Sequence, residues 1–158
     1  MSRITLEKKG DSHISQIKQE SVKDEIVVNL NWNQEPRKKS GFLSNLLKNR
    51  DSAIDLDLGC FFELSNGYKS VIDGLQFSKK QGGSRTQSTL QGCYIGEPWV
   101  WHTGDDRSGS QMATGESILI NPQGYDDIRR LTIYAYIYEG VSKWEQCNAV
   151  ITIKVPGS

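Results

Sequence analysis

A period-two alternation over residues 54–64 limits how this chain can fold more than any other feature. Successive side chains of a β-strand point to opposite faces, so this period predicts a long strand with one buried face and one solvated face. The apolar face comprises Ile54, Leu56, Leu58, Cys60, Phe62 and Leu64. The other face comprises Asp55, Asp57, Gly59, Phe61 and Glu63.

The same period recurs along most of the chain and predicts further strands. Residues 131–138 carry aliphatic side chains on one face and a threonine with three tyrosines on the other. Ser65-Asn66-Gly67 has the composition of a hairpin turn. Short turns and almost no helical periodicity predict an all-β, antiparallel β-sandwich, whereas a parallel α/β fold would need helices. The remaining predicted strands are 26–32, 71–77, 93–101, 116–121 and 149–155.

A length of 158 residues suits a single domain, and we expect residues 1–158 to form one sandwich. Residues 36–50 interrupt the strand pattern with five basic residues and no acid. Phe42, Leu43, Leu46 and Leu47 recur there at helical spacing, which predicts a short basic amphipathic insertion. This insertion either caps one end of the sandwich or docks on a partner protein or an acidic membrane surface.

Charge and composition exclude several classes of protein. Nineteen Lys and Arg residues balance nineteen Asp and Glu residues, so the chain lacks the cationic field that general nucleic-acid binding needs. No apolar run is long enough to cross a bilayer, and the first residues lack a secretory pattern, so we expect a cytoplasmic protein. Cys60, Cys93 and Cys147 are widely spaced, which favours buried, reduced thiols.

Acidic residues recur at spacings that suit a calcium ion. Asp55 and Asp57 share one strand face with Cα atoms about 7 Å apart. Asp105 and Asp106 follow in a glycine-punctuated loop, and Glu116 begins the next predicted strand. Ca²⁺ takes six to eight oxygen ligands, often from such loops. The spacing predicts a Ca²⁺ site, although Asp and Gly also form ordinary surface turns without a metal.

Several of these segments resemble one protein family. Residues 53–64 resemble the "DLDL" strand of the tellurite-resistance TerD superfamily, and residues 102–109 resemble its "GDDxTG" loop. Residues 29–32 are similar to its early "L.W" strand. Residues 135–140, together with Trp144, are similar to the "AYIYEG" segment of the TerA-like branch. The similarities occur in the order of the family and extend from about residue 26 to residue 155.

The resemblance implies a Ca²⁺-binding β-sandwich in a cytoplasmic bacterial protein linked to tellurite resistance and general stress response. It also implies other proteins of a stress-response complex as partners. In TerD-like members an acidic run precedes the last ligand, but residues 110–115 contain no acid here. Fewer carboxylates predict one site, or one strong and one lost. The implied ligands are Asp55, Asp57, Asp105, Asp106 and Glu116, with Ser108 a weaker participant.

Two other functions can be compared with this one. Catalysis is not expected, because His13 and His102 are the only histidines and no Ser-His-Asp or Cys-His arrangement can be built around them. The alternative is a carbohydrate-binding or other small-ligand module with a structural Ca²⁺. It rests on Trp99 and Trp101 on one face of a predicted strand and on the tyrosines of residues 131–138, which could stack on a ligand.

Overall fold

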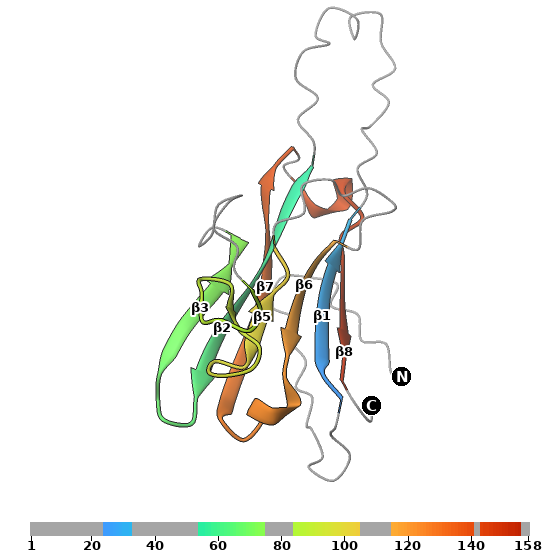
Figure 1. Ribbon diagram of the computed structural model, residues 1–158. Helices are drawn as coiled ribbons and strands as arrows, with labels where there is room; N and C mark the ends of the chain where they lie inside the picture. The colour runs from blue at the N-terminus through green and yellow to red at the C-terminus, as the bar shows by residue number, and fades with distance from the viewer. Residues whose placement is uncertain (1–23, 33–53, 75–83, 105–114, 141–142, 156–158) are drawn as a thin grey trace, which may run out of the picture.

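The computed structural model describes residues 24–32, 54–74, 84–104, 115–140 and 143–155, which form two antiparallel sheets packed face to face (Figure 1). This architecture confirms the predicted all-β sandwich. The predicted basic insertion at 36–50 lies outside the described residues. No helix among the described residues is long and apolar enough to cross a membrane.

The two sheets differ in size, with five strands in one and three in the other. The larger sheet has the order β4 (Gly92–Cys93), β5 (Val100–His102), β6 (Glu116–Ile120), β1 (Ile26–Asn31) and β8 (Val150–Lys154). The smaller sheet has the order β3 (Lys69–Asp73), β2 (Asp55–Leu64) and β7 (Ile128–Glu139). Two short 3-10 helices flank β7, η3 (Pro122–Gly124) and η4 (Trp144–Gln146).

Most predicted strands lie within a few residues of their expected bounds. The predicted turn at residues 65–67 is also present, with Gly67 at a φ of +87°. The single strand predicted over residues 93–101 is wrong. It divides into β4 and β5, which pair with each other on either side of residues 94–99. Pro98 lies in this connection, and proline cannot donate to a strand ladder.

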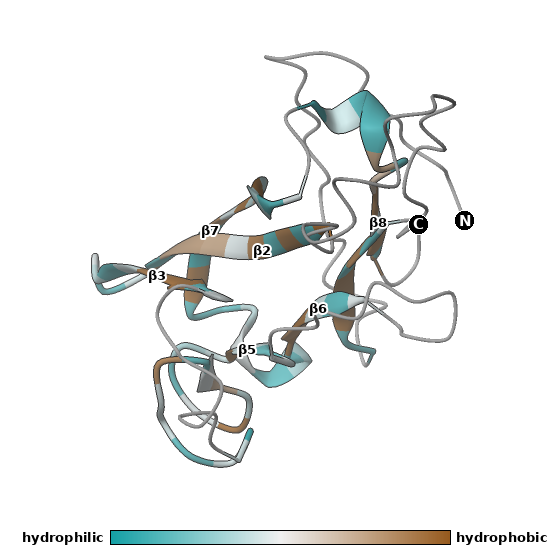
Figure 2. Cartoon of the chain, turned by 90° about the horizontal axis from the view of Figure 1, so that it is seen from above, coloured by the Kyte–Doolittle hydropathy of each residue, from teal (hydrophilic) through white to brown (hydrophobic). Residues whose placement is uncertain are grey.

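The core lies between the two sheets, as the alternation in β2 predicted. Leu56, Leu58 and Cys60 are fully buried against Ile118 and other apolar residues of β1 and β6. The alternation of hydrophobic and hydrophilic residues along the strands is visible in Figure 2. All three cysteines are free and buried, which confirms that prediction. Burial raises the pKa of the Cys60 thiol to about 12, so it stays protonated at neutral pH.

The outer face of β2 departs from the expected half-buried strand. Asp55 and Asp57 are each only 5% exposed. On the neighbouring β7, Tyr136 is paired with Asp57 and Tyr134 with Gly59, so both tyrosines share this face. A Cβ atom added at Gly59 would collide with the Tyr134 ring. The alternation correctly predicted the two faces, but neighbouring tyrosines cover the face that was expected to be solvated.

The β8 edge of the sandwich is less covered than its centre. Ile151 and Ile153 are paired with Leu30 and Val28 of β1, whose side chains are buried in the core. Despite this orientation, Ile151 is 39% exposed and Ile153 is 50% exposed. Among the described residues the opposite sheet has three strands against five, which offers less apolar surface to cover the outermost strand β8.

Candidate metal site

Three carboxylates gather on the outer face of the smaller sheet. Asp55 and Asp57 come from β2, and Asp73 comes from the end of β3, where it is paired with Gly59. All three are buried. The Oδ1 atom of Asp57 lies so close to Gly74 that a Cβ atom there would collide with it. Asp57 therefore lies against the chain as it leaves β3.

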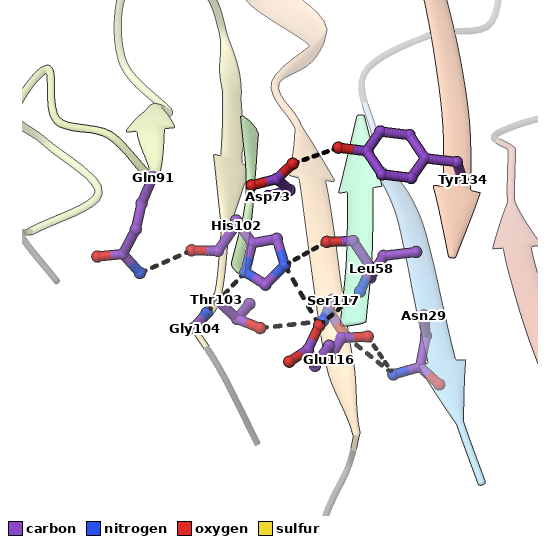
Figure 3. Close-up of polar contacts among 10 residues, drawn as sticks. All are labelled: Asn29, Leu58, Asp73, Gln91, His102, Thr103, Gly104, Glu116, Ser117 and Tyr134. Atoms are coloured by element: carbon purple, nitrogen blue, oxygen red, sulfur yellow. Dashed lines mark hydrogen bonds and ion pairs between the residues drawn. The ribbon is translucent and has the colours of Figure 1, made fainter. Parts of the chain in front are cut away.

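Sequence reasoning missed Asp73, which lies inside the strand predicted over residues 71–77 and is the last residue of the observed β3. It also missed the hydroxyl of Tyr134, which binds Asp73. Tyr134 donates a short hydrogen bond from its hydroxyl to Asp73 Oδ2 (Figure 3). Only the pairing register between β2, β3 and β7 brings these groups together, and no local pattern in the sequence contains that register.

The pKa values of Tyr134 and Tyr136 both depend on the nearby charges of Asp57 and Asp73. Burial raises the pKa of Tyr134 well above its usual value, and the hydrogen bond to Asp73 and the charge of Asp73 raise it further. Burial likewise raises the pKa of Tyr136, followed by the charges of Asp57 and Asp73. Both hydroxyls therefore remain protonated at neutral pH beside these carboxylates.

Glu116 reaches β2 from the opposite sheet. It is the first residue of β6, its side chain is completely buried, and its Oε2 accepts a hydrogen bond from the Leu58 N–H at 2.8 Å (Figure 3). The pairing of β2 with β3 begins at Gly59, so Leu58, the residue before it, has no partner residue on β3. A carboxylate from the other sheet thus takes the place of a strand partner at this point.

His102 binds the same residue of β2 from the end of β5. Its Nε2 lies 3.0 Å from the Leu58 carbonyl oxygen and 3.5 Å from Glu116 Oε2. Its Nδ1 accepts a hydrogen bond from the Gly104 N–H at 3.0 Å. Because Nδ1 is an acceptor, the ring proton is assigned to Nε2, which donates to the Leu58 carbonyl in a neutral imidazole.

The two ends of the segment that carries Asp105 and Asp106 are anchored beside this contact. The Thr103 N–H donates to the Ser117 carbonyl at 2.8 Å, and the Ser117 N–H donates back to Thr103 Oγ1 at 3.0 Å. Gly115 has a φ of +65°, and a Cβ atom there would collide with the Leu30 carbonyl. Asp105, Asp106 and Ser108 themselves lie outside the described residues.

The structure therefore describes only three of the five predicted ligands, Asp55, Asp57 and Glu116. Asp55 and Asp57 share the outer face of β2, whereas Glu116 approaches from the interior and is already bonded to Leu58. Among the described residues no group of three or more His, Cys, Asp or Glu side chains is arranged to hold a metal ion. The carboxylate oxygens of Asp55 and Asp57 suit the hard-oxygen chemistry of Ca²⁺, and further ligands would have to come from elsewhere.

The aromatic residues of the alternative function are arranged differently from the prediction. Trp99 is not in a strand: it precedes β5 with a φ of +62°, and its indole N–H donates to Asp127 Oδ2 at 2.9 Å. Trp101 is buried. Tyr134 lies against Asp73, and Tyr138 is the exposed tyrosine of β7. The two tryptophans therefore do not share a strand face, whereas the three tyrosines do lie on one face of β7, where Tyr134 and Tyr136 are half-buried and Tyr138 is exposed.

Comparison with known proteins identifies the family of the chain. No family model matches it. Over 132 residues, or 84% of its length, it is 40% identical to the tellurium resistance protein TerA of an Alcaligenes species. The aligned part makes up 34% of that relative, so the chain spans about a third of its length. In agreement with the strand and loop motifs, the chain belongs to the tellurite-resistance TerD/TerA-like family.

Proposed function

We propose that this chain is a non-catalytic, Ca²⁺-binding subunit of a bacterial tellurite-resistance and stress-response system. The tellurite-resistance role is supported by the similarity to a protein named tellurium resistance protein TerA. The proposed ligands are Asp55 and Asp57 of β2 together with Asp105 and Asp106. Glu116 completes the predicted set, although its Oε2 is bonded to the Leu58 N–H.

One observation carries the calcium proposal: Asp57 and both ends of the 105–114 segment meet at the same place on β2. Glu116 and His102 each bind Leu58, the residue after Asp57, and His102 also binds Gly104, the residue before Asp105. The residues that flank the 105–114 segment are thereby anchored beside the residue that follows Asp57 on β2.

Electrostatics supports a cation at this end. Asp55 and Asp57 are buried side by side on one face, with Asp73 nearby. Buried like charges repel one another and lose hydration, so a cation bound among them lowers the cost of keeping them ionised. When bound, Ca²⁺ would supply that positive charge. The protein's own part is to hold the oxygen atoms of the strand and the loop in place.

Calorimetric titration of the full chain with Ca²⁺ tests this proposal. We expect about one ion per chain, because residues 110–115 lack the carboxylates that a second site needs. Asp57→Asn keeps the side-chain shape and removes the charge, and we expect it to lower the affinity at least tenfold. Glu63→Gln is the matched control, since Glu63 shares the same strand face but lies beside Lys69 and Arg129.

Three results would contradict the calcium proposal as stated. The wild-type chain binding no Ca²⁺ would refute the site, and equal losses in Asp57→Asn and Glu63→Gln would show a nonspecific charge effect. Two tight ions per chain would refute the single site.

The interaction role rests on different evidence. We propose that the chain acts in the cytoplasm with other proteins of a stress-response complex, and that residues 36–50 contact a partner protein or an anionic membrane surface. The five basic residues of this segment support the proposal. Sedimentation with anionic vesicles tests the membrane contact. A Lys38→Glu, Lys39→Glu double variant should lose it, and equal sedimentation of both proteins would contradict it.

A further inference from the structure

We infer that Glu116 and His102 are positioning residues of the calcium site, which hold its two halves together without touching the ion. This inference rests on the proposed function. It gives Glu116 a different role from the ligand role that the family resemblance implies.

Glu116 acts on the peptide group next to Asp57. The Leu58 N–H belongs to the peptide bond that joins Asp57 to Leu58, and Glu116 Oε2 accepts its hydrogen at 2.8 Å. A buried N–H that loses its acceptor costs about 1–3 kcal/mol, so this bond fixes the plane of that peptide. Fixing that plane restrains the ψ angle of Asp57 and so the backbone from which its side chain projects. Glu116 also lies on the core side of β2, whereas Asp57 lies on the outer face.

His102 connects the next peptide group of β2, which joins Leu58 to Gly59, to the loop. Its Nε2–H binds the Leu58 carbonyl, and its Nδ1 accepts from Gly104, the residue directly before Asp105. Gln91 in turn holds the backbone of His102 through two hydrogen bonds. The side-chain amide of Gln91 donates to the His102 carbonyl at 3.0 Å, and the backbone carbonyl of Gln91 accepts from the His102 N–H at 2.9 Å. A single neutral ring therefore links the strand that carries Asp57 to the start of the segment that carries Asp105.

Substitutions of similar shape separate positioning from ligation. Glu116→Gln keeps an oxygen that accepts from Leu58 but removes the negative charge that a Ca²⁺ ligand supplies. His102→Gln places its amide nitrogen near the ring Nε2 position and keeps the bond to Leu58, but it removes the acceptor of Gly104. His102→Asn places its oxygen near the Nδ1 position and keeps the bond to Gly104, but it removes the donor to Leu58.

The experiment measures Ca²⁺ affinity by calorimetry for the wild-type full chain and for these variants, with Asp57→Asn as the ligand reference. We expect Glu116→Gln to bind within about threefold of wild type and both His102 variants to bind about tenfold more weakly. Amide hydrogen exchange without Ca²⁺ provides a second readout. In His102→Gln the Gly104 amide should exchange faster while the Leu58 amide stays protected.

The outcomes distinguish this inference from the function on which it rests. If Glu116→Gln loses as much affinity as Asp57→Asn, Glu116 is a ligand and the inference is wrong. If both His102 variants are folded and bind like the wild type, the bridge is not needed and the inference is wrong. If the wild-type chain binds no Ca²⁺, the proposed function itself fails, and this inference fails with it.

Discussion

Gly59 provides a stringent test of how the outer face of β2 is built. A Cβ atom added there would lie 2.6 Å from Cε2 of Tyr134 and 2.5 Å from its hydroxyl oxygen. Carbon atoms pack best at about 3.5–4.0 Å, and the ring carbon Cζ is nearer still than Cε2, so Gly59→Ala must move the ring by more than about 1 Å. Overpacking of this kind costs about 1–3 kcal/mol. If the displaced hydroxyl also loses its hydrogen bond to the Asp73 carboxylate, the unfolding free energy falls by about 4 kcal/mol in total. A water molecule that replaces this hydrogen bond would reduce the fall.

Urea unfolding of Gly59→Ala, Gly96→Ala, Tyr134→Ala and the Gly59→Ala, Tyr134→Ala double variant measures this cost. Gly96→Ala is the matched control, because a Cβ atom there meets only Cys93 Sγ at 3.7 Å, and we expect it to change the unfolding free energy by less than about 0.5 kcal/mol. Gly59→Ala made in a Tyr134→Ala background should cost little, since the colliding ring is gone. A cost that persists in that background, or no cost in the wild-type background, would refute the placement of Tyr134 over Gly59.

Two further predictions concern the core and the buried thiol. Ile118→Ala should destabilise the protein by about 2–5 kcal/mol because Ile118 is fully buried, whereas Ile153→Ala, half exposed on β8, should cost about 1 kcal/mol or less. Equal costs in urea unfolding would contradict the open β8 edge. The folded pKa of Cys60 is raised above its ordinary value of 9.0 to about 12, so its contribution to stability is complete below pH 9 and is lost as the pH rises toward 12. Cys60→Ala should reduce the fall in unfolding free energy between pH 8 and pH 10.5, and an unchanged fall would contradict this assignment.

The strands that could be predicted are those with a long and regular alternation. β2 and β7 each carry an uninterrupted period of two, and β1, β6 and β8 carry shorter versions of it. The core side of β2 was therefore evident from residues 54–64 alone. Residues 93–101 lack such a pattern. Their aromatic and apolar composition favoured a strand, but Pro98 and the backbone of Trp99 interrupt it.

The site was only partly predictable, because its contacts join residues far apart in the chain. The alternation placed Asp55 and Asp57 on one face but indicated solvent there, since it contains no information about Tyr134 and Tyr136 on β7. The contact of His102 with Leu58 spans 44 positions, and that of Glu116 with Leu58 spans 58. Such contacts follow from how the two sheets stack, and no spacing motif encodes this stacking.

The location of the ion is the claim on which this account depends most. An NMR titration of the ¹⁵N-labelled full chain with Ca²⁺ tests it directly, because amide shifts report binding residue by residue. We predict the largest changes at the amides of residues 55–58, at Gly104 and at Gly115, where the strand and the two ends of the 105–114 segment meet. Saturable changes centred on other residues, or no saturable change at all, would contradict the proposed site.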